Sequence, residues 1–316
     1  MFDVVTLGET MVLLSNENGQ MLRSPLLSKR IGGAESNVAI GLTRLGHKVA
    51  WVSKLGEDPF GDEILYHLRG EGINTEFVLR DPGNLTGLMI KDLKSFGDPS
   101  VYYYRKNSAA STMKWAELPL EPFKHTKIIH LTGITPAISH SCRSLVHQLV
   151  EFAKVENKKI SFDPNLRLKL WSIEEARKTI LELLPNVDYF FPGIEEAELL
   201  AGVEPGELSP KKLSEFFHGL GMGKVILKLG DRGCTIATPT SYEEVSGFRI
   251  TPVDTVGAGD GFCAGFLSGL LDEIPLMDAA RRANAVGAIT GKGDYDQLPS
   301  KKELEYFMFN KSEVKR

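Results

Sequence analysis

The sequence contains few cysteines: Cys142, Cys234 and Cys263 are the only three in 316 residues, and they lie far apart in the chain. Neither a disulfide framework nor the paired spacing of a zinc site can be built from them, so each is expected to be a buried packing residue. The seven histidines show no H-E-x-x-H or related spacing, so no transition-metal site is expected. His130 is interpreted as a histidine of a core or edge strand rather than a ligand.

The chain also lacks an excess of positive charge, with 37 Lys and Arg against 41 Asp and Glu and a formal net charge of -4. Nucleic-acid binding depends on clustered basic side chains that neutralise phosphates, so no nucleic-acid partner is expected. No run of about 18 apolar residues is present, and the opening MFDVVTLGET does not resemble a signal peptide. The sequence therefore predicts no membrane association and a cytoplasmic location.

Short β-branched runs alternate with helical patterns along most of the chain. Residues 3–8 favour a strand, 34–46 a helix, and 58–72 a second helix that begins at Asp-Pro and ends at Gly. The alternation resumes at 127–133 and continues to two closing helices after Gly257. Strands separated by helices of this length predict an α/β fold whose mostly parallel sheet is covered by helices on both faces.

Two segments interrupt the alternation, at approximately 10–31 and 75–107. Their apolar residues alternate with polar ones, and they contain Asn-Gly, Pro-Gly and Gly-Asp turns, which is typical of antiparallel strands. We expect them to form a small β-sheet inserted into a single domain of residues 1–316. Over the carboxyl ends of the main strands, such a sheet would act as a lid on a ligand. The alternative is that the sheet only packs or joins copies of the chain into a homo-oligomer, and both roles are compatible.

The segment DTVGAGDGF precedes an apolar helical run. The unpaired N–H groups of Gly257, Ala258 and Gly259 at the helix N-terminus are therefore expected to bind an anion. Asp260 in the first turn would repel that anion, unless the anion is a phosphoryl group in transfer and the carboxylate accepts the proton of the attacking hydroxyl. Asp254 is interpreted as a supporting or turn-capping acid, with contact to a metal or substrate as the alternative. The alternative is a tight turn with an N-cap aspartate.

Two familiar nucleotide motifs, G-x-x-x-x-G-K-[ST] and a G-x-G-x-x-G after the first strand, are absent. Instead, IGGAESNVAIGLTRLG and DTVGAGDGFCAGF resemble the N-terminal and C-terminal signatures of the ribokinase-like, or PfkB, carbohydrate kinases. The resemblance covers essentially the whole chain. It implies a ribokinase-like fold with a β lid, ATP as phosphoryl donor, Mg²⁺, and a small hydroxylated acceptor.

The resemblance also implies roles for single residues. Asp260 would be the catalytic base, and the amides of Gly257, Ala258 and Gly259 would form the anion hole. The acceptor would contact Gly32, Gly33 and Asn37, because glycines admit close backbone approach and an amide both donates to and accepts from hydroxyls. The alternative for these three residues is a glycine turn that starts a helix, with Asn37 simply packed.

The nucleotide side is implied by LKLGDRG and RRANAVGAI. By resemblance, Lys228, Gly230 and Gly233 would lie beside the phosphates or ribose, and Asn284 beside the adenine. Without the resemblance, the first segment is an ordinary β-hairpin and Asn284 a helix residue that faces solvent.

One position departs from the family pattern. The family carries an Asn-x-x-Glu motif linked to magnesium and phosphate, whereas FPGIEEAELL places Gly193 where the Asn is expected. Glu196 is retained, and we expect it to order the metal through water.

Two arginines point to the acceptor. Tyr103 and Arg105 lie on the expected lid, and Arg167 follows a strand end in DPNLR. Guanidinium groups make planar, charge-assisted contacts to carboxylates, so two converging arginines favour an acid sugar. Both segments resemble the 2-keto-3-deoxygluconate kinase branch of the family, which implies that Gly33, Tyr103, Arg105 and Arg167 hold this keto acid.

Other acceptors and functions stay open. DPNLR also resembles bacterial fructokinases, and Met89 stands where some relatives in the keto-acid branch carry a tyrosine. The alternatives are a fructokinase or another neutral-sugar kinase, a nucleoside kinase, and a non-catalytic sugar or nucleotide sensor on the same fold. For Arg105 alone, the alternative is a surface ion pair of little energetic value.

Overall fold

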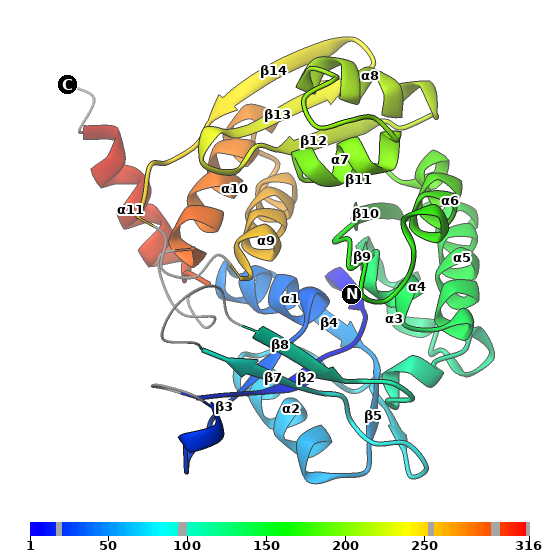
Figure 1. Ribbon diagram of the computed structural model, residues 1–316. Helices are drawn as coiled ribbons and strands as arrows, with labels where there is room; N and C mark the ends of the chain where they lie inside the picture. Colours follow the sequence, from blue (N-terminus) through cyan, green and yellow to red (C-terminus); the bar gives the residue numbers. More distant parts are fainter. Residues whose placement is uncertain (17–20, 94–99, 252–255, 292–297, 314–316) are drawn as a thin grey trace.

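A sheet of eight strands runs through the centre of the molecule (Figure 1). The computed structural model describes residues 1–16, 21–93, 100–251, 256–291 and 298–313. The strand order is β14-β13-β12-β11-β10-β9-β1-β4, in which the β12–β13 and β13–β14 pairs are antiparallel and the other neighbouring pairs are parallel. Its strands are β1 (Phe2–Leu7), β4 (Val49–Val52), β9 (Thr126–Thr132), β10 (Lys159–Asp163), β11 (Tyr189–Phe190), β12 (Lys224–Lys228), β13 (Gly233–Thr238) and β14 (Ser241–Ser246). The predicted, mostly parallel sheet is confirmed.

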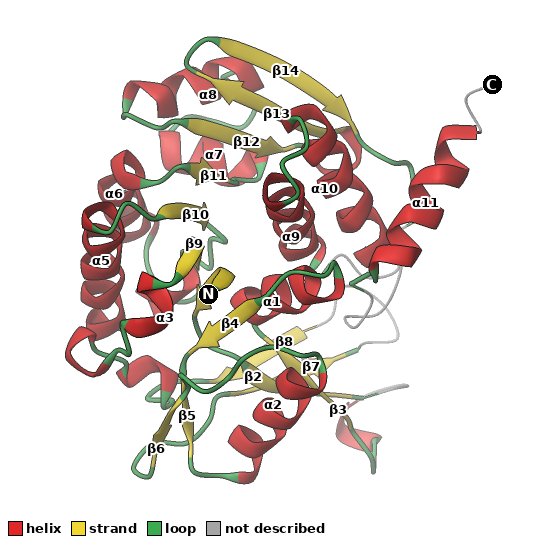
Figure 2. Cartoon of the chain, turned by 180° about the vertical axis from the view of Figure 1, so that it is seen from behind, coloured by secondary structure: helices red, strands yellow, loops and turns green. Residues whose placement is uncertain are grey.

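Helices cover both faces of this sheet, as Figure 2 shows from behind. One face packs against α3 (Glu121–Lys124), α4 (Ile134–Ile138), α5 (His140–Val155), α6 (Ile173–Leu183), α7 (Ile194–Ala201) and α8 (Pro210–Gly219). The other face packs against α1 (Ala34–Arg44), α2 (Pro59–Gly70), α9 (Ala258–Leu271) and α10 (Leu276–Thr290), and α11 (Lys301–Glu313) packs on α10. Short 3-10 turns lie at Met21–Arg23, Ala110–Thr112, Trp115–Glu117, Leu184–Asn186 and Gly230–Arg232. No helix in these described ranges is long and apolar enough to cross a membrane.

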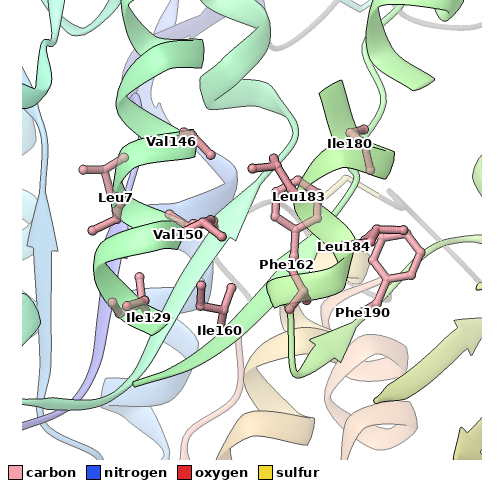
Figure 3. Close-up of a cluster of buried hydrophobic side chains, with 14 of the residues drawn as sticks. Leu7, Ile129, Val146, Val150, Ile160, Phe162, Ile180, Leu183, Leu184 and Phe190 are labelled. Atoms are coloured by element: carbon pink, nitrogen blue, oxygen red, sulfur yellow. The ribbon is translucent and has the colours of Figure 1, made fainter. Parts of the chain in front are cut away.

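The helix α5 illustrates how the sequence builds the core. The hydroxyl of Ser139 accepts a hydrogen bond from the N–H of Cys142 at 3.1 Å and begins the helix. Apolar residues then recur every three to four positions and form one buried face. Figure 3 shows Val146 and Val150 of this face beside the strand residues Ile129 and Ile160. Burying each such side chain contributes about 1.5–3 kcal/mol. All three cysteines and His130 are buried, as predicted.

A separate four-stranded sheet lies beside α1 and α2 (Figure 1), and we call it the lid sheet. Its strands are β2 (Met11–Ser15), β3 (Ser28–Gly32), β7 (Leu88–Asp92) and β8 (Ser100–Tyr104), in the order β3-β2-β7-β8. The β2–β3 and β7–β8 pairs are antiparallel as predicted, but β2 and β7 are parallel. The chain enters the lid sheet from the core at the start of both β2 and β7, so these two strands run in the same direction.

One strand within the range 75–107 is not part of the lid sheet. The strand β6 (Leu79–Asp81) pairs in parallel with β5 (Lys54–Gly56) in a separate two-stranded sheet. The prediction that the residues of β6 contribute to the lid sheet is therefore wrong. After α2 the chain first forms β6 beside β5, and it enters the lid sheet only at β7.

Candidate active site

Two cavities meet at the carboxyl ends of β10 and β12, where ligands bind in open α/β sheets. The first, of about 350 Å³, lies between the lid sheet and the core, with Met89 on one side and Asp163 on the other. We call it the lid cavity. The second, of about 300 Å³, lies between the β12–β13 turn and the helices α9 and α10, and we call it the helix cavity. Lys228 and Gly259 line both.

The residues singled out in the sequence divide between these cavities. The lid cavity is lined by Gly32, Gly33, Asn37, Tyr103, Arg105, Arg167, Glu196, Gly257 and Asp260. The helix cavity is lined by Gly230, Gly233, Ala258 and Asn284. Asp254 lies outside the described residues. Gly33 and Asp260, which are 227 residues apart in the sequence, thus line the same cavity, and Lys228 lies where this cavity meets the second.

The N-terminus of α9 lies at this junction. Gly257 precedes the helix at φ +80°, a left-handed conformation that favours glycine. The N–H groups of the first turn have no partner within the helix and lie at the positive end of its dipole. A Cβ on Gly259 would lie 3.5 Å from the ammonium of Lys228. Backbone amides and a lysine therefore converge on one point that can hold an anion.

Asp260 lies in the first turn of α9 and is 8% exposed. Its Oδ2 accepts a hydrogen bond from Nδ2 of Asn37 at 2.7 Å, and its Oδ1 accepts a longer one from Nδ2 of Asn165 at 3.4 Å. Burial raises the pKa of Asp260 to about 7; the bond from Asn37 opposes this rise, and the charge of Asp163 adds to it. A carboxyl with this pKa can accept a proton near neutral pH.

This raised pKa predicts that Asp260 destabilises the fold where it is ionised. The folded protein binds the proton more tightly than the unfolded chain, so stability falls as pH rises from about 4 to 7. Asp260→Asn should therefore unfold at a higher temperature than the wild type at pH 8, with a difference that shrinks toward pH 5. At about 1.4 kcal/mol per pKa unit, the gain is at most about 4 kcal/mol.

Thermal unfolding followed from pH 5 to pH 8 tests this prediction. The control is Asp62→Asn, which removes an exposed carboxylate paired with Arg80. It measures the effect of the same type of substitution at the surface, and a less stable Asp260→Asn protein at pH 8 would contradict the argument.

Lys228, at the end of β12, is held by a buried carboxylate. Its Nζ donates to Oδ2 of Asp163 at 2.7 Å, and the thiol of Cys263 donates to the same oxygen at 3.3 Å. Burial alone would lower the pKa of Lys228, but nearby negative charges, chiefly that of Asp163, outweigh it and raise this pKa. Burial, with the charge of Asp163, raises the pKa of Cys263 and keeps it a thiol. The lysine therefore presents a permanent positive charge between the two cavities.

Glu196 connects two loops beside the lid cavity. Its Oε2 accepts from the N–H of Gly193 at 2.8 Å and caps α7, while its Oε1 accepts from the N–H of Leu166 at 2.8 Å. Burial raises the pKa of Glu196, and the positive charge of Lys228 opposes this rise. The carboxylate thus holds the DPNLR loop against α7. Among the described residues, no group of three or more His, Cys, Asp or Glu side chains is arranged to hold a metal.

The two arginines of the lid cavity differ in their surroundings. Arg167 is exposed, and its Nη1 donates to the carbonyl of Leu166 at 3.0 Å. Arg105 is 8% exposed, and its Nε donates to Oε2 of Glu9 at 2.7 Å. The alternative of a surface ion pair for Arg105 is wrong, because both partners are buried. Its guanidinium also lies 5.8 Å from the ring centre of Tyr103.

Close packing explains two other predicted positions. A Cβ on Gly33 would lie 2.4 Å from the carbonyl oxygen of Glu9, so only glycine fits there. Asn284 is buried rather than facing solvent, and its Nδ2 donates to the carbonyls of Val245 and Ser246 at 3.2 and 3.3 Å. It therefore holds β14 against α10 at the wall of the helix cavity.

Sequence reasoning missed three polar residues in or beside the site. Glu9 follows β1, and Asp163 and Asn165 belong to the DPN element after β10, so all three lie at carboxyl ends of parallel strands. Their position at predicted strand ends could have identified them, because the carboxyl ends of parallel strands converge at one edge of the sheet, where ligands bind. The partners Arg105 and Lys228 come from distant segments and could not be identified from spacing.

Known proteins resemble this chain over nearly its whole length. Residues 1–302 match the pfkB family of carbohydrate kinases. A 2-dehydro-3-deoxygluconokinase of Bacillus subtilis is 42% identical, over 97% of this chain and 95% of that protein. A probable fructokinase-3 of Arabidopsis thaliana is 35% identical, over 99% and 92%. An E. coli protein assigned as ribokinase II, solved with ATP and Mg²⁺, superposes with a TM-score of 0.88 at 25% identity, over 98% of this chain and 100% of that one.

The family match, the ribokinase-like architecture and the paired cavities agree. The chain therefore belongs to the pfkB family and is a carbohydrate kinase, an enzyme that transfers a phosphoryl group to an alcohol.

Proposed function

We propose that this kinase phosphorylates the 6-hydroxyl of 2-keto-3-deoxygluconate with ATP as donor. The observation that carries the proposal is that Arg105 and Arg167 line the same cavity as Asp260. Guanidinium groups bind carboxylates through charge-assisted hydrogen bonds, and a neutral sugar has no group that requires two of them. The 42% identity to the Bacillus subtilis 2-dehydro-3-deoxygluconokinase supports this acceptor.

In this proposal, the lid cavity takes the acceptor. Gly33 admits close approach of the sugar, and Tyr103 contacts it from β8. Arg105 and Arg167 bind its carboxylate, which leaves the hydroxyl at the opposite end to face Asp260. Asn37 donates to Asp260 and orients the carboxylate that accepts the hydroxyl proton. The lid sheet covers the cavity and excludes water.

The helix cavity takes ATP. Gly230 and Gly233 leave room beside β12 and β13 for the ribose and phosphates, and Asn284 lies at the far wall. The terminal phosphate meets the amides of Gly257, Ala258 and Gly259 where the two cavities join. Lys228 lines both cavities, so its ammonium is placed to stabilise the charge that develops on the transferred phosphoryl group.

Magnesium fits the donor set as an ion shared with the nucleotide. Mg²⁺ keeps several waters and binds one or two carboxylates together with substrate phosphates. The carboxylate of Glu196 lines the lid cavity, and each oxygen that accepts one backbone N–H retains a further acceptor position. Glu196 would hold the ion through water, without the Asn that Gly193 replaces. When bound, the ion neutralises part of the phosphate charge.

The test is ADP release from magnesium-ATP with 2-keto-3-deoxygluconate, fructose, ribose and adenosine as acceptors. The keto acid should have the highest kcat/KM, and Arg105→Ala should raise its KM by about 10- to 100-fold, the value of a charge-assisted hydrogen bond. Arg80→Ala, which removes a surface ion pair with Asp62, is the matched control and should leave KM unchanged.

Other outcomes point to the alternatives. A preference for fructose with little effect of Arg105→Ala would favour the fructokinase, which the 35% identity to the Arabidopsis protein supports. No ADP release with any acceptor would favour a sensor. Association of copies through the lid sheet belongs to the same proposal, supported by the exposed Tyr102 and Tyr104 on the edge strand β8.

A further inference from the structure

A buried carboxylate lies where the lid sheet joins the core. Glu9 lies two residues after the end of β1, is 2% exposed, and lines neither of the two cavities. Its Oε2 accepts a hydrogen bond from Nε of Arg105 at 2.7 Å and an ion-pair contact from Nη2 of the same side chain. Its Oε1 accepts a hydrogen bond from the hydroxyl of Ser108. Glu9 has no role of its own in the proposed phosphoryl transfer.

The chain passes between core and lid sheet four times, and Glu9 contacts every crossing. It lies on the first, between β1 and β2. At the second, a Cβ on Gly33 would lie 2.4 Å from the carbonyl oxygen of Glu9. At the third, a Cβ on Gly87 would lie 2.7 Å from its Oε1. The fourth, after β8, carries Arg105 and Ser108. Glu9 is therefore enclosed by the segments that connect the lid sheet to the core, and its carboxylate faces the third and fourth of them.

The ion pair fixes one edge of the Arg105 guanidinium. Nε and Nη2 face Glu9, while the side chain also lines the lid cavity. A guanidinium is planar and carries five N–H donors in a rigid fork, so holding one edge orients the donors that remain. Removal of one partner of a buried pair leaves an uncompensated charge, which favours rearrangement of the other.

We propose that Glu9 is a positioning residue for Arg105. It orients the guanidinium toward the carboxylate end of the acceptor and does not touch the substrate itself. Because Glu9 lies among the segments that connect the lid sheet to the core, it also links the position of the guanidinium to the position of the lid sheet. This inference rests on the proposed function. Glu9 also offsets the positive charge of Arg105, so removing its carboxylate has two opposite effects on substrate binding. Loss of the orientation of Arg105 weakens binding of the substrate carboxylate, whereas loss of the opposing charge alone would strengthen it.

A double-mutant cycle on kinase activity tests the inference, with wild type, Glu9→Gln, Arg105→Ala and the double variant compared. Glutamine keeps the size and one acceptor of Glu9 but removes the charge. Glu9→Gln should raise the KM for the keto acid about tenfold, the lower end for a charged hydrogen bond, and leave the KM for ATP unchanged. In the Arg105→Ala background the same substitution should change the keto-acid KM less than about twofold, because the residue that it positions is gone.

Several results would overturn the proposal. If Glu9→Gln has the same effect on the keto-acid KM in the wild type and in Arg105→Ala, Glu9 acts independently of Arg105. If Glu9→Gln lowers this KM, the charge of Glu9 matters more than the orientation that it gives to Arg105. Ser108→Ala is a second variant, which keeps all charges and should raise the keto-acid KM by a smaller factor than Glu9→Gln. An unchanged KM in both Glu9→Gln and Ser108→Ala would also contradict the positioning role of Glu9.

Two controls separate this inference from a structural effect and from the acceptor assignment. Glu63→Gln removes a different ion pair between core and lid sheet, with Lys29 of β3, and should leave KM unchanged. If Arg105→Ala does not affect the keto-acid KM, the acceptor assignment fails. If Arg105→Ala does and Glu9→Gln does not, only the role of Glu9 fails. If the acceptor panel identifies another sugar, the four proteins are compared on that sugar.

Discussion

Asp260→Asn is expected to lower kcat by about 10²- to 10⁴-fold, the range that a positioned general base contributes. The asparagine keeps the shape of the side chain and an oxygen that accepts from Asn37, but it cannot take the hydroxyl proton. KM values for ATP and the acceptor should change only a few-fold, because neither is proposed to bind through the charge of Asp260. Steady-state ADP release measures both parameters.

The pH profile provides an independent check on the same residue. Because the pKa of Asp260 is raised to about 7 and the base acts when deprotonated, kcat/KM of the wild type should fall as pH decreases through this range. The residual activity of Asp260→Asn should lose this dependence. Full turnover by the variant would remove the base assignment.

Lys228→Met is expected to lower kcat by about 10²- to 10³-fold, the loss observed when one preorganised donor to a developing charge is removed. Lys228 lines both cavities and lies beside Gly259, where phosphoryl transfer is proposed. Methionine preserves much of the length and apolar stem of lysine. The KM for the acceptor should change little, because Arg105 and Arg167 are proposed to bind it.

The control for this prediction addresses stability. Removing Lys228 alone leaves Asp163 as a buried, unpaired charge, which can destabilise a protein by about 3–5 kcal/mol. The double variant Lys228→Met and Asp163→Asn removes both charges and should recover stability in thermal unfolding. If it also recovers kcat, the lysine supports the fold rather than the transferred phosphoryl group.

Local patterns in the sequence predicted much of the architecture. The amphipathic period of α5, the Asp-Pro start of α2 and the β-branched runs of β9 and β12 follow from neighbouring residues and identify the parallel α/β core. The direction of β2 relative to β7, and the pairing of β6 with β5, do not follow from local patterns. Both depend on where distant segments cross between core and lid.

The candidate site divides in the same way. The position of Asp260 in the first turn of a glycine-rich helix start could be predicted, because it is a local arrangement. The ion pairs of Arg105 with Glu9 and of Lys228 with Asp163 could not. Their partners are separated by tens of residues, and spacing indicates neither which charges are buried nor which face each other.

The sequence by itself determined the fold class, the two signature segments and the types of side chain available for phosphoryl transfer, since these depend on composition, period and local turns. The tertiary structure alone decided which charges are paired and how the two cavities meet. It also decided that Asp260 has a pKa near neutrality. Burial and electrostatic interaction depend on distances in space, and only the folded chain brings Asn37, Asp163, Lys228 and Asp260 together.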